Sequence, residues 1–208
     1  MIAVRCASLL DGFQKKNNAK AIQSIDVRDA IKANRPEIVS NAVGLIHSNE
    51  QIFEQFLNDQ TLLVPVPSHS LTRKDSKLKT ELLCESLVEN GLGAGLMRLV
   101  SRIEPTRKAA FCPPLERPTV KEHFDTLSCQ GQIPIGITQI TIVDDILTQG
   151  HTTMACYQHL KLAFPDADIK IFTFVRTNSR ELCKETFVLP RESELRYFSR
   201  TGKTFMEG

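Results

Sequence analysis

The sequence has no closely spaced pair of cysteines, and this absence excludes two classes of protein. Its six cysteines stand singly, without a C-x-x-C pair. They are Cys6, Cys84, Cys112, Cys129, Cys156 and Cys183. Structural zinc sites and the disulfide frameworks of small secreted domains both need cysteines at short, recurring spacings. We therefore expect neither kind of site, and we expect the thiols to stay reduced.

Long apolar runs are also missing. No run reaches the roughly 18 apolar residues that indicate a membrane-spanning helix. The apolar residues 2–10 are interrupted by Arg5 and followed by Asp11, so they do not form the uninterrupted core of a signal peptide. The sequence therefore predicts a cytoplasmic protein without membrane association.

Neither sign of charge is in large excess. Lys and Arg number 26 and Asp and Glu number 24, which gives a formal net charge of +2. So small an excess does not indicate direct binding of nucleic acid across the surface. The chain has 208 residues, 41% of them hydrophobic, and no internal repeat or low-complexity tract, which suits one folded α/β domain.

Residues 140–153 combine a strand, two acids and the start of a helix, and the rest of the chain is interpreted around them. Residues 140–143 form a β-branched apolar run that suits a strand buried on both faces. Asp144 and Asp145 follow where this strand should leave the sheet, and a helical pattern covers residues 152–164. Two carboxylates in such a position can accept hydrogen bonds from sugar hydroxyls or from the water shell of Mg²⁺.

The turn between the acids and this helix has the composition of an anion site. Gly150 lets the backbone approach a ligand closely, and Thr148, Thr152 and Thr153 offer hydroxyl groups. The first turn of a helix adds unpaired N–H groups and the positive end of the helix dipole. The sequence therefore predicts an anion site beside the acid pair.

A second candidate site follows the apolar residues 61–67. Pro65 and Pro67 cannot donate to a central strand ladder, so we expect the strand to pass here into a stiff loop over residues 67–70. Loops at the carboxyl edge of a parallel sheet bind the ligands of α/β proteins. A plain connection to the helix expected over residues 77–90 is the alternative.

The remaining pattern predicts an α/β fold with a mostly parallel, doubly wound sheet. Residues 1–60 are interpreted as a helical N-terminal cap in the same domain as the core, residues 61–208. Residues 101–124 show no period and carry several basic side chains, which would either close over an anionic ligand or stay solvated. Residues 126–138 are expected to form turns. Further helices are expected over residues 24–34 and 36–57, and further strands over residues 96–100 and 168–175.

Residues 143–152 resemble the signature of type I phosphoribosyltransferases, in which a hydrophobic strand is followed by two acidic residues and a T-x-G-x-T-like loop. A narrower resemblance is to the ComF-type, competence-associated branch of that family. Its V-P-V-P-x-H…R segment is similar to residues 64–73, and its R…T-x-x-Q…E-R…F segment is similar to residues 102–124. The resemblance covers residues 62–176, without the N-terminal zinc-binding cysteines common in that branch.

The resemblance implies a transferase that binds 5-phosphoribosyl 1-pyrophosphate, with Mg²⁺ as its cofactor. It would transfer the phosphoribosyl group to a nucleobase or related nitrogen acceptor and release pyrophosphate, as enzymes of nucleotide metabolism do. The residues implied in substrate binding are Thr148, Gln149, Gly150, His151 and Thr152 around the 5-phosphate, and Pro67, Ser68, His69 and Arg73 in the proline-rich segment. The residues implied in catalysis are Asp144 and Asp145, which would also hold the metal, and Arg102, Arg107 and Lys108. One of these three cations would arrive on a mobile loop to neutralise the departing pyrophosphate.

Three functional interpretations are left open. The first is an active phosphoribosyltransferase, and the second is a non-catalytic module that senses phosphoribosyl pyrophosphate or a nucleotide. The third is a competence or DNA-metabolism partner protein that keeps only the fold. His69 is either a pyrophosphate contact or a neutral loop histidine, and His151 would act mainly through its backbone N–H. The acceptor is left open, as is the oligomeric state, a homodimer included.

Overall fold

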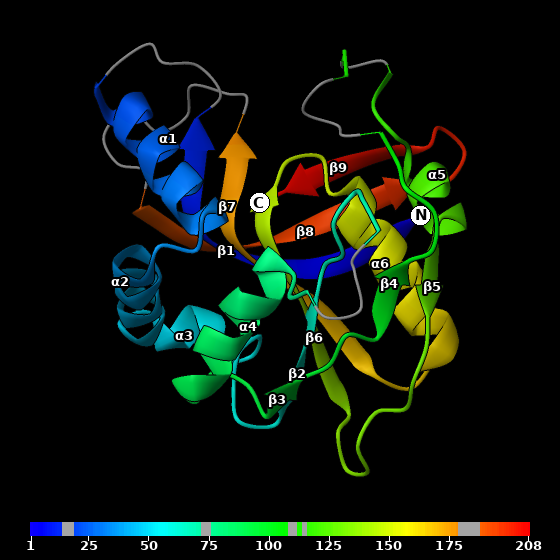
Figure 1. The fold of residues 1–208 in the computed structure, drawn as a ribbon, viewed down its shortest axis with the longest axis horizontal. Helices are drawn as coiled ribbons and strands as arrows, with labels where there is room; N and C mark the ends of the chain where they lie inside the picture. Colours follow the sequence, from blue (N-terminus) through cyan, green and yellow to red (C-terminus); the bar gives the residue numbers. More distant parts are fainter. Residues whose placement is uncertain (14–18, 72–75, 108–111, 114–115, 179–187) are drawn as a thin grey trace.

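A computed structural model describes residues 1–13, 19–71, 76–107, 112–113, 116–178 and 188–208. Its centre is a seven-stranded sheet in the order β3-β2-β6-β7-β1-β8-β9 (Figure 1). From β3 to β1 every pairing is parallel, whereas β8 and β9 run antiparallel to their neighbours. The strands of this sheet are β1 (Ile2–Phe13), β2 (Thr61–Pro65), β3 (Gly95–Leu96), β6 (Gln139–Leu147), β7 (Asp168–Asn178), β8 (Val188–Phe198) and β9 (Lys203–Glu207). The predicted α/β class with a mostly parallel sheet is confirmed.

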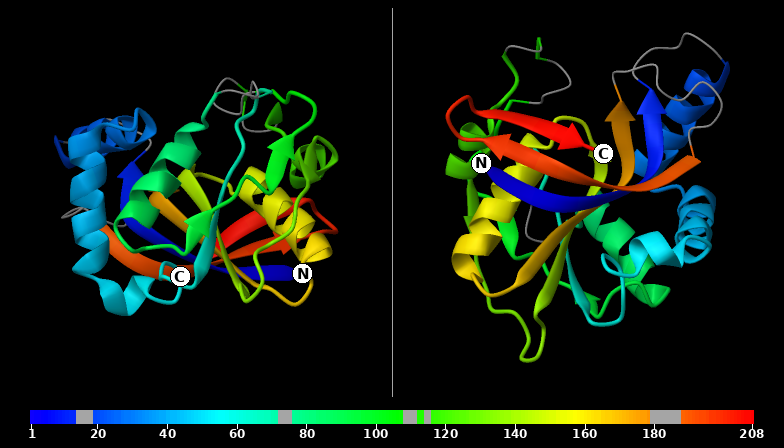
Figure 2. Two further views of the ribbon diagram at one scale, coloured as in Figure 1. Left: turned by 60° about the horizontal axis from the view of Figure 1, so that its bottom comes forward. Right: turned by 180° about the vertical axis from the view of Figure 1, so that it is seen from behind.

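Helices cover both faces of the sheet (Figure 2). The helices on one face are α1 (Ala19–Lys32), α2 (Pro36–His47), α3 (Glu50–Phe53) and α4 (Lys79–Glu89). Those on the other face are α5 (Val120–Asp125) and α6 (His151–Ala163), which pack with a separate hairpin of β4 (Val100–Arg102) and β5 (Leu127–Cys129). None of the helices in the described segments is long and apolar enough to cross a bilayer.

Two apolar layers attach these helices to the sheet. Beneath α1–α4, the ring of Phe53 meets Phe172 edge-on with centroids 5.7 Å apart, and Phe172 meets Phe174 similarly at 5.1 Å. Beneath α6, Ile140 and Ile142 of β6 are fully buried. Each large apolar side chain that is buried contributes about 1.5–3 kcal/mol. Packing on both faces therefore fixes β6, the strand that carries the acid pair.

The register of β2 against β6 brings the two predicted ligand segments together. Pro65, the last residue of β2, lies opposite Val143 of β6, and the Val66 N–H donates to the Val143 carbonyl oxygen at 3.0 Å. The proline-rich segment therefore leaves the sheet beside Asp144. β6 itself continues to Leu147, so the acid pair lies within the strand and not after it.

Two segments differ from the sequence-based expectation. The interpretation of residues 1–60 as a helical cap misses β1, which lies inside the sheet between β7 and β8. Residues 101–138, expected as a loop followed by turns, contain the end of β4, all of α5 and β5. A capping box starts α5, because Thr119 Oγ1 accepts from the Glu122 N–H at 3.2 Å while Glu122 Oε2 accepts from the Thr119 N–H at 2.7 Å.

Candidate functional site

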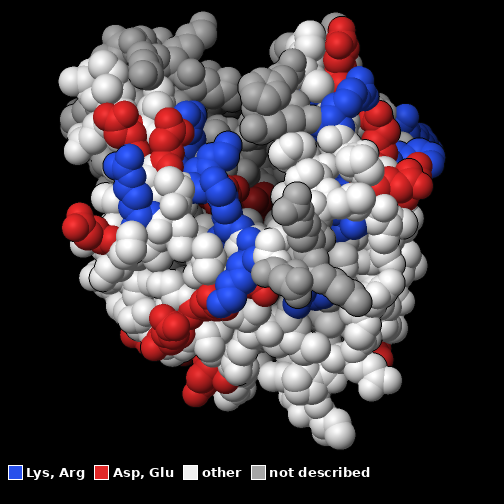
Figure 3. Space-filling model, viewed as in Figure 1, with Lys and Arg blue, Asp and Glu red and all other residues white. Residues whose placement is uncertain are grey.

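Two cavities open at the carboxyl edge of the sheet, and Asp144 lines both of them. Each has a volume of about 510 Å³. The space-filling view shows acidic atoms at the bottom of a hollow, with Lys and Arg side chains around it (Figure 3). The first, called the helix cavity below, is lined among others by Arg28, Arg117, His123, Thr148, Gly150 and Thr152. The second, called the loop cavity, is lined among others by Lys32, Pro67, His69, Lys77, Lys79 and Asp145.

The acid pair lies where the two cavities meet. Asp144 is half-buried, and its Oδ2 accepts a hydrogen bond of 3.0 Å from the Thr153 hydroxyl. Asp145 Oδ1 accepts from the Ile146 N–H at 2.8 Å. Burial raises the pKa of Asp144 well above its ordinary value, and the charge of Asp145 raises it further, while the Thr153 hydroxyl opposes the rise. A cation or a hydroxyl donor placed here would relieve negative charge that the protein alone solvates poorly.

The helix cavity is built around the first turn of α6. Gly150 precedes the helix with a φ of 71°, and its carbonyl oxygen accepts the first helical hydrogen bond from the Met154 N–H at 2.8 Å. No side chain of the described segments caps this turn, so its first N–H groups are left for a ligand. From behind, Leu195 of β8 packs against Gly150, and the Thr204 hydroxyl of β9 donates to the Gln149 carbonyl oxygen. The C-terminal strands therefore support the turn.

Replacing Gly150 with alanine should lower the free energy of unfolding by about 2–4 kcal/mol. The left-handed backbone costs an L-residue about 1–2 kcal/mol, and a Cβ here would lie 2.8 Å from the Leu195 side chain. Gly202→Ala is the matched control, since its φ is 66° and no described atom lies within 4 Å of its Cβ. We expect it to lose only about 1–2 kcal/mol in urea unfolding. Equal losses in the two variants would contradict the support of the turn by Leu195.

Hydrogen bonds to three carbonyl groups hold the proline-rich loop of the loop cavity. The Ser68 hydroxyl donates to the Ser70 carbonyl oxygen at 2.8 Å, and the Thr106 N–H donates to the His69 carbonyl oxygen at 2.8 Å. Arg102 Nε donates to the Ser68 carbonyl oxygen at 2.9 Å. The shape of this loop is therefore set by the surrounding chain before any ligand arrives.

Two of the predicted catalytic cations line neither of these two cavities. Arg102 is 6% exposed, and its Nη1 donates to Thr126 Oγ1 at 2.7 Å. Arg107 is exposed, and its Nη2 forms an ion pair with Glu122 Oε1 at 2.8 Å. Arg102 therefore supports the proline-rich loop from strand β4, whereas the resemblance implied that one of Arg102, Arg107 and Lys108 would arrive on a mobile loop.

The other predicted site residues divide between the two cavities. The helix cavity receives Thr148, Gln149, Gly150, His151 and Thr152 in addition to Asp144. The loop cavity receives Pro67, Ser68 and His69 in addition to both acids. Two further predicted residues, Arg73 and Lys108, lie outside the described segments. The structure therefore brings the strand end, the turn and the proline-rich loop together at one sheet edge, whereas neither Arg102 nor Arg107 lines either of these two cavities.

Tertiary structure adds cations that the sequence does not single out. Arg28 and Lys32 both come from α1, and they line the helix cavity and the loop cavity respectively. No local signal could reveal them, because only folding brings α1 to the acid pair. Arg117 also lines the helix cavity, and its buried Nε has no hydrogen-bond partner in the described part of the chain. In the sequence, Arg117 is marked only by its position in the segment that is similar to the ComF-type branch.

Among the described residues, no group of three or more His, Cys, Asp or Glu side chains could hold a metal by itself, and no disulfide joins the described cysteines. The acid pair nevertheless fits one kind of metal. Mg²⁺ is commonly bound through one or two carboxylates, with water and substrate phosphates completing its coordination. Asp144 and Asp145 supply two such carboxylates, beside two cavities that are lined by basic side chains.

Comparisons with known proteins do not show to which family the chain belongs. No model of a known protein family matches the chain, and no curated protein matches it. Among solved structures, the chain is similar to adenine phosphoribosyltransferase from Trypanosoma brucei in complex with AMP, pyrophosphate and ribose-5-phosphate. The TM-score is 0.34 and the sequence identity 11%, over 76% of this chain and 75% of that chain. So low a score carries no argument about function, and the functional conclusion rests on the site itself.

Proposed function

We propose that this protein binds 5-phosphoribosyl 1-pyrophosphate with Mg²⁺ and acts as a phosphoribosyltransferase on a nitrogen acceptor. The observation that supports this most is that Asp144 lines both cavities. One of them has the open first turn of α6 with two arginines, and the other has a fixed loop with three lysines. A ligand with a single phosphate would fill one cavity, whereas a sugar with phosphate groups at both ends matches both. The resemblance of residues 62–176 to the ComF-type branch supports the same ligand.

Each part of this ligand would have its own partners. The 5-phosphate would accept hydrogen bonds from the N–H groups of the α6 first turn and from the hydroxyls of Thr148 and Thr152. Asp144 and Asp145 would accept from the ribose hydroxyls, directly or through metal-bound water. Bound Mg²⁺ would neutralise charge on the pyrophosphate. The pyrophosphate would lie in the loop cavity beside Lys32 and Lys77.

The chemistry of such a site consists mainly of positioning and charge stabilisation. The acceptor nitrogen would form its bond to ribose C1 as the bond from C1 to the pyrophosphate oxygen breaks, through an oxocarbenium-like state. The lysines of the loop cavity would stabilise the negative charge that develops on the leaving oxygen. Loss of one such contact typically costs about 3–4 kcal/mol of barrier.

A calorimetric titration of the intact protein tests this proposal. We expect phosphoribosyl pyrophosphate with Mg²⁺ to bind more tightly than ribose 5-phosphate or pyrophosphate alone, because only the complete ligand occupies both cavities. Chelation of the metal with EDTA should weaken its binding. An absence of binding by phosphoribosyl pyrophosphate in the presence of Mg²⁺ would rule out the proposal.

A non-catalytic sensor of the same ligand is the second candidate. It is favoured by one observation, that Arg102 and Arg107 are both engaged away from the cavities, which leaves no described arginine beside the pyrophosphate position. Pyrophosphate release measured across a panel of nucleobases separates the two candidates. Release with any base identifies a transferase, and binding without release identifies a sensor.

A further inference from the structure

A buried chain of hydrogen bonds connects the two cavities. Arg102 Nε donates to the Ser68 carbonyl oxygen in the proline-rich loop, and Arg102 Nη2 lies 3.4 Å from His123 Nδ1. His123 Nε2 in turn lies 3.2 Å from the hydroxyl oxygen of Thr152 at the start of α6. Arg102 is 6% exposed and His123 is 5% exposed. The chain therefore begins at one cavity, passes through the protein and ends at the other.

The charge on Arg102 fixes the tautomer of His123. A guanidinium only donates, so His123 Nδ1 must accept and carry no proton. The proton of the neutral ring then lies on Nε2, which donates to the Thr152 oxygen. Burial, followed by the positive charge of Arg102 and then His151, lowers the pKa of His123 to about 4, against a smaller opposing effect of Glu122. The ring is therefore neutral at physiological pH.

The tautomer of His123 determines whether the Thr152 hydroxyl can donate a hydrogen bond to a ligand. Because its oxygen already accepts from His123, its own hydrogen has no other partner among the described residues and is left for the helix cavity, which Thr152 lines. With the opposite tautomer, Thr152 would have to donate to His123 and would present a lone pair to an incoming anion. The two tautomers thus make this hydroxyl either attractive or repulsive to a phosphate.

We propose that His123 is a positioning residue, held by Arg102, that keeps the Thr152 hydroxyl directed as a donor to an anion in the helix cavity. The identity of that anion as the 5-phosphate rests on the proposed function. The tautomer does not rest on it. His123 is one of the residues that line the helix cavity, and it would act on the anion through the Thr152 hydroxyl and not on the reacting atoms.

Nitrogen NMR of the imidazole ring tests the tautomer without any ligand. In the full-length protein labelled with ¹⁵N-histidine, we expect the His123 ring at pH 7 to be neutral and protonated on Nε2. The assignment can be made by comparison with the His123→Asn spectrum. A proton on Nδ1, or a doubly protonated ring, would overturn the inference whatever the protein binds.

Two amide substitutions test the consequence for binding. His123→Asn places an oxygen near the former Nδ1, so it can still accept from Arg102 but no longer donates to Thr152. His123→Gln places an amide near the former Nε2 and can restore that donor. With ribose 5-phosphate as the probe, we expect His123→Asn to weaken binding about tenfold, which corresponds to the loss of one charge-assisted hydrogen bond. His123→Gln should recover most of this loss. Pyrophosphate, which probes the loop cavity, should bind His123→Asn about as well as it binds the wild type.

A double-mutant cycle with Thr152→Val separates positioning from general destabilisation. If His123 acts through Thr152, then His123→Asn should add almost nothing in a Thr152→Val background. Additive losses, or equal losses for ribose 5-phosphate and pyrophosphate, would contradict the positioning role. If the wild type binds neither probe, the proposed function fails and the role in phosphate binding fails with it. If the wild type binds ribose 5-phosphate and His123→Asn binds it equally well, only the positioning role is overturned.

Discussion

Replacement of both acids, Asp144→Asn together with Asp145→Asn, should abolish the Mg²⁺-dependent part of phosphoribosyl pyrophosphate affinity while the protein stays folded. The amides keep the size of the side chains, and an amide oxygen can still accept from the Thr153 hydroxyl. They remove the negative charge that a divalent cation needs. Calorimetric titration with and without Mg²⁺ measures the effect, and the two curves of the variant should coincide.

Asp166→Asn is the control for this variant. Asp166 is exposed and precedes β7, so it lies at the opposite, amino edge of the sheet. This substitution should leave both the Mg²⁺ dependence and the affinity as they are in the wild type. Mg²⁺-dependent binding that survives in the double variant would refute the assignment of the acid pair.

The same double variant should become more stable relative to the wild type as the pH rises. Because the pKa of Asp144 is raised above its ordinary value of 3.8, the folded state favours the protonated acid. The wild type therefore loses stability as the pH rises from that ordinary value through the raised pKa, whereas an uncharged amide does not. Urea unfolding from pH 4 to pH 8 should show a difference in free energy that grows in favour of the variant. A difference that shrinks with rising pH would contradict the burial of this charge.

The strand, acid pair and turn of residues 140–153 could be predicted because their signals are local. An apolar β-branched run, two adjacent acids and a glycine before a helical pattern all lie within one short window. The position of the proline-rich loop also followed, since parallel strands end at one edge of a sheet. The basic walls of the cavities could not be predicted, because Arg28 and Lys32 belong to a helix far away in the sequence.

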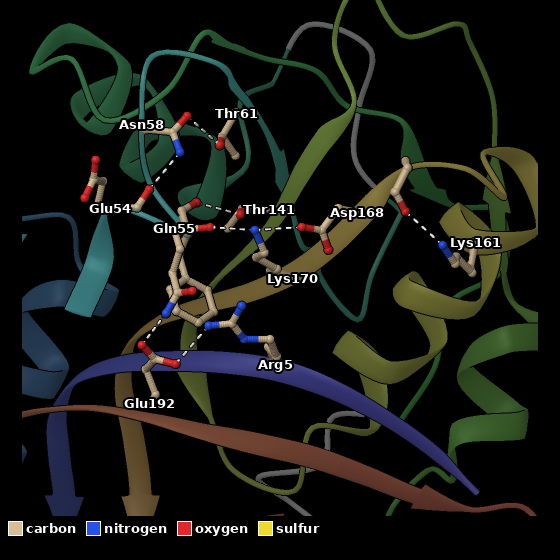
Figure 4. Close-up of polar contacts among 12 residues, drawn as sticks. Arg5, Glu54, Gln55, Asn58, Thr61, Thr141, Lys161, Asp168, Lys170 and Glu192 are labelled. Carbon is tan, nitrogen blue, oxygen red and sulfur yellow. Dashed lines mark hydrogen bonds and ion pairs between the residues drawn. The ribbon is translucent and has the colours of Figure 1, made fainter. Parts of the chain in front are cut away.

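The sequence pattern does not predict the strand β1, because the partners of its polar residues lie near the other end of the chain. Arg5 and Asp11 interrupt its apolar pattern, which argues against a central strand. In the structure, Arg5 reaches Glu192 on β8 at 3.1 Å, and Gln55 meets the same carboxylate (Figure 4). Asp11 accepts from Arg191 Nη2 at 2.7 Å. Polar residues in β1 are thus matched by partners in β8, and no local pattern records such pairs.

Lys170 is another polar residue that is explained only by distant partners. It is 7% exposed, its Nζ donates to the Gln55 carbonyl oxygen at 2.8 Å, and it pairs with Asp168 at 2.8 Å (Figure 4). Nearby, the Thr141 hydroxyl donates to the Phe56 carbonyl oxygen at 2.6 Å. These contacts tie the chain after α3 to β6 and β7. Alternation of side chains predicted the strand at residues 168–175, but not this attachment.

Arg102→Leu should lower the free energy of unfolding by about 2–4 kcal/mol. The guanidinium makes hydrogen bonds to the Ser68 carbonyl oxygen and to Thr126 Oγ1, and hydrogen bonds to charged groups contribute about 1.5–3 kcal/mol each. Relief of the cost of burying a charge offsets part of that loss. For a chain of this size we expect the melting temperature to fall by about 5–15 °C.

The effect on binding distinguishes a support for the loop from a catalytic cation. Without Arg102, the proline-rich loop loses an anchor and His123 loses the donor that fixes its tautomer, so affinity should fall for both pyrophosphate and ribose 5-phosphate. Arg107→Leu is the matched control, because its exposed pair with Glu122 is worth only about 0–1 kcal/mol and its loss should leave both affinities unchanged. A side chain that only neutralised the departing pyrophosphate would give the reverse result for Arg102→Leu, namely slower turnover at an unchanged melting temperature. The buried guanidinium has a partner at each of its three nitrogens, which favours the first outcome, since a cation held in this way cannot also move to a ligand.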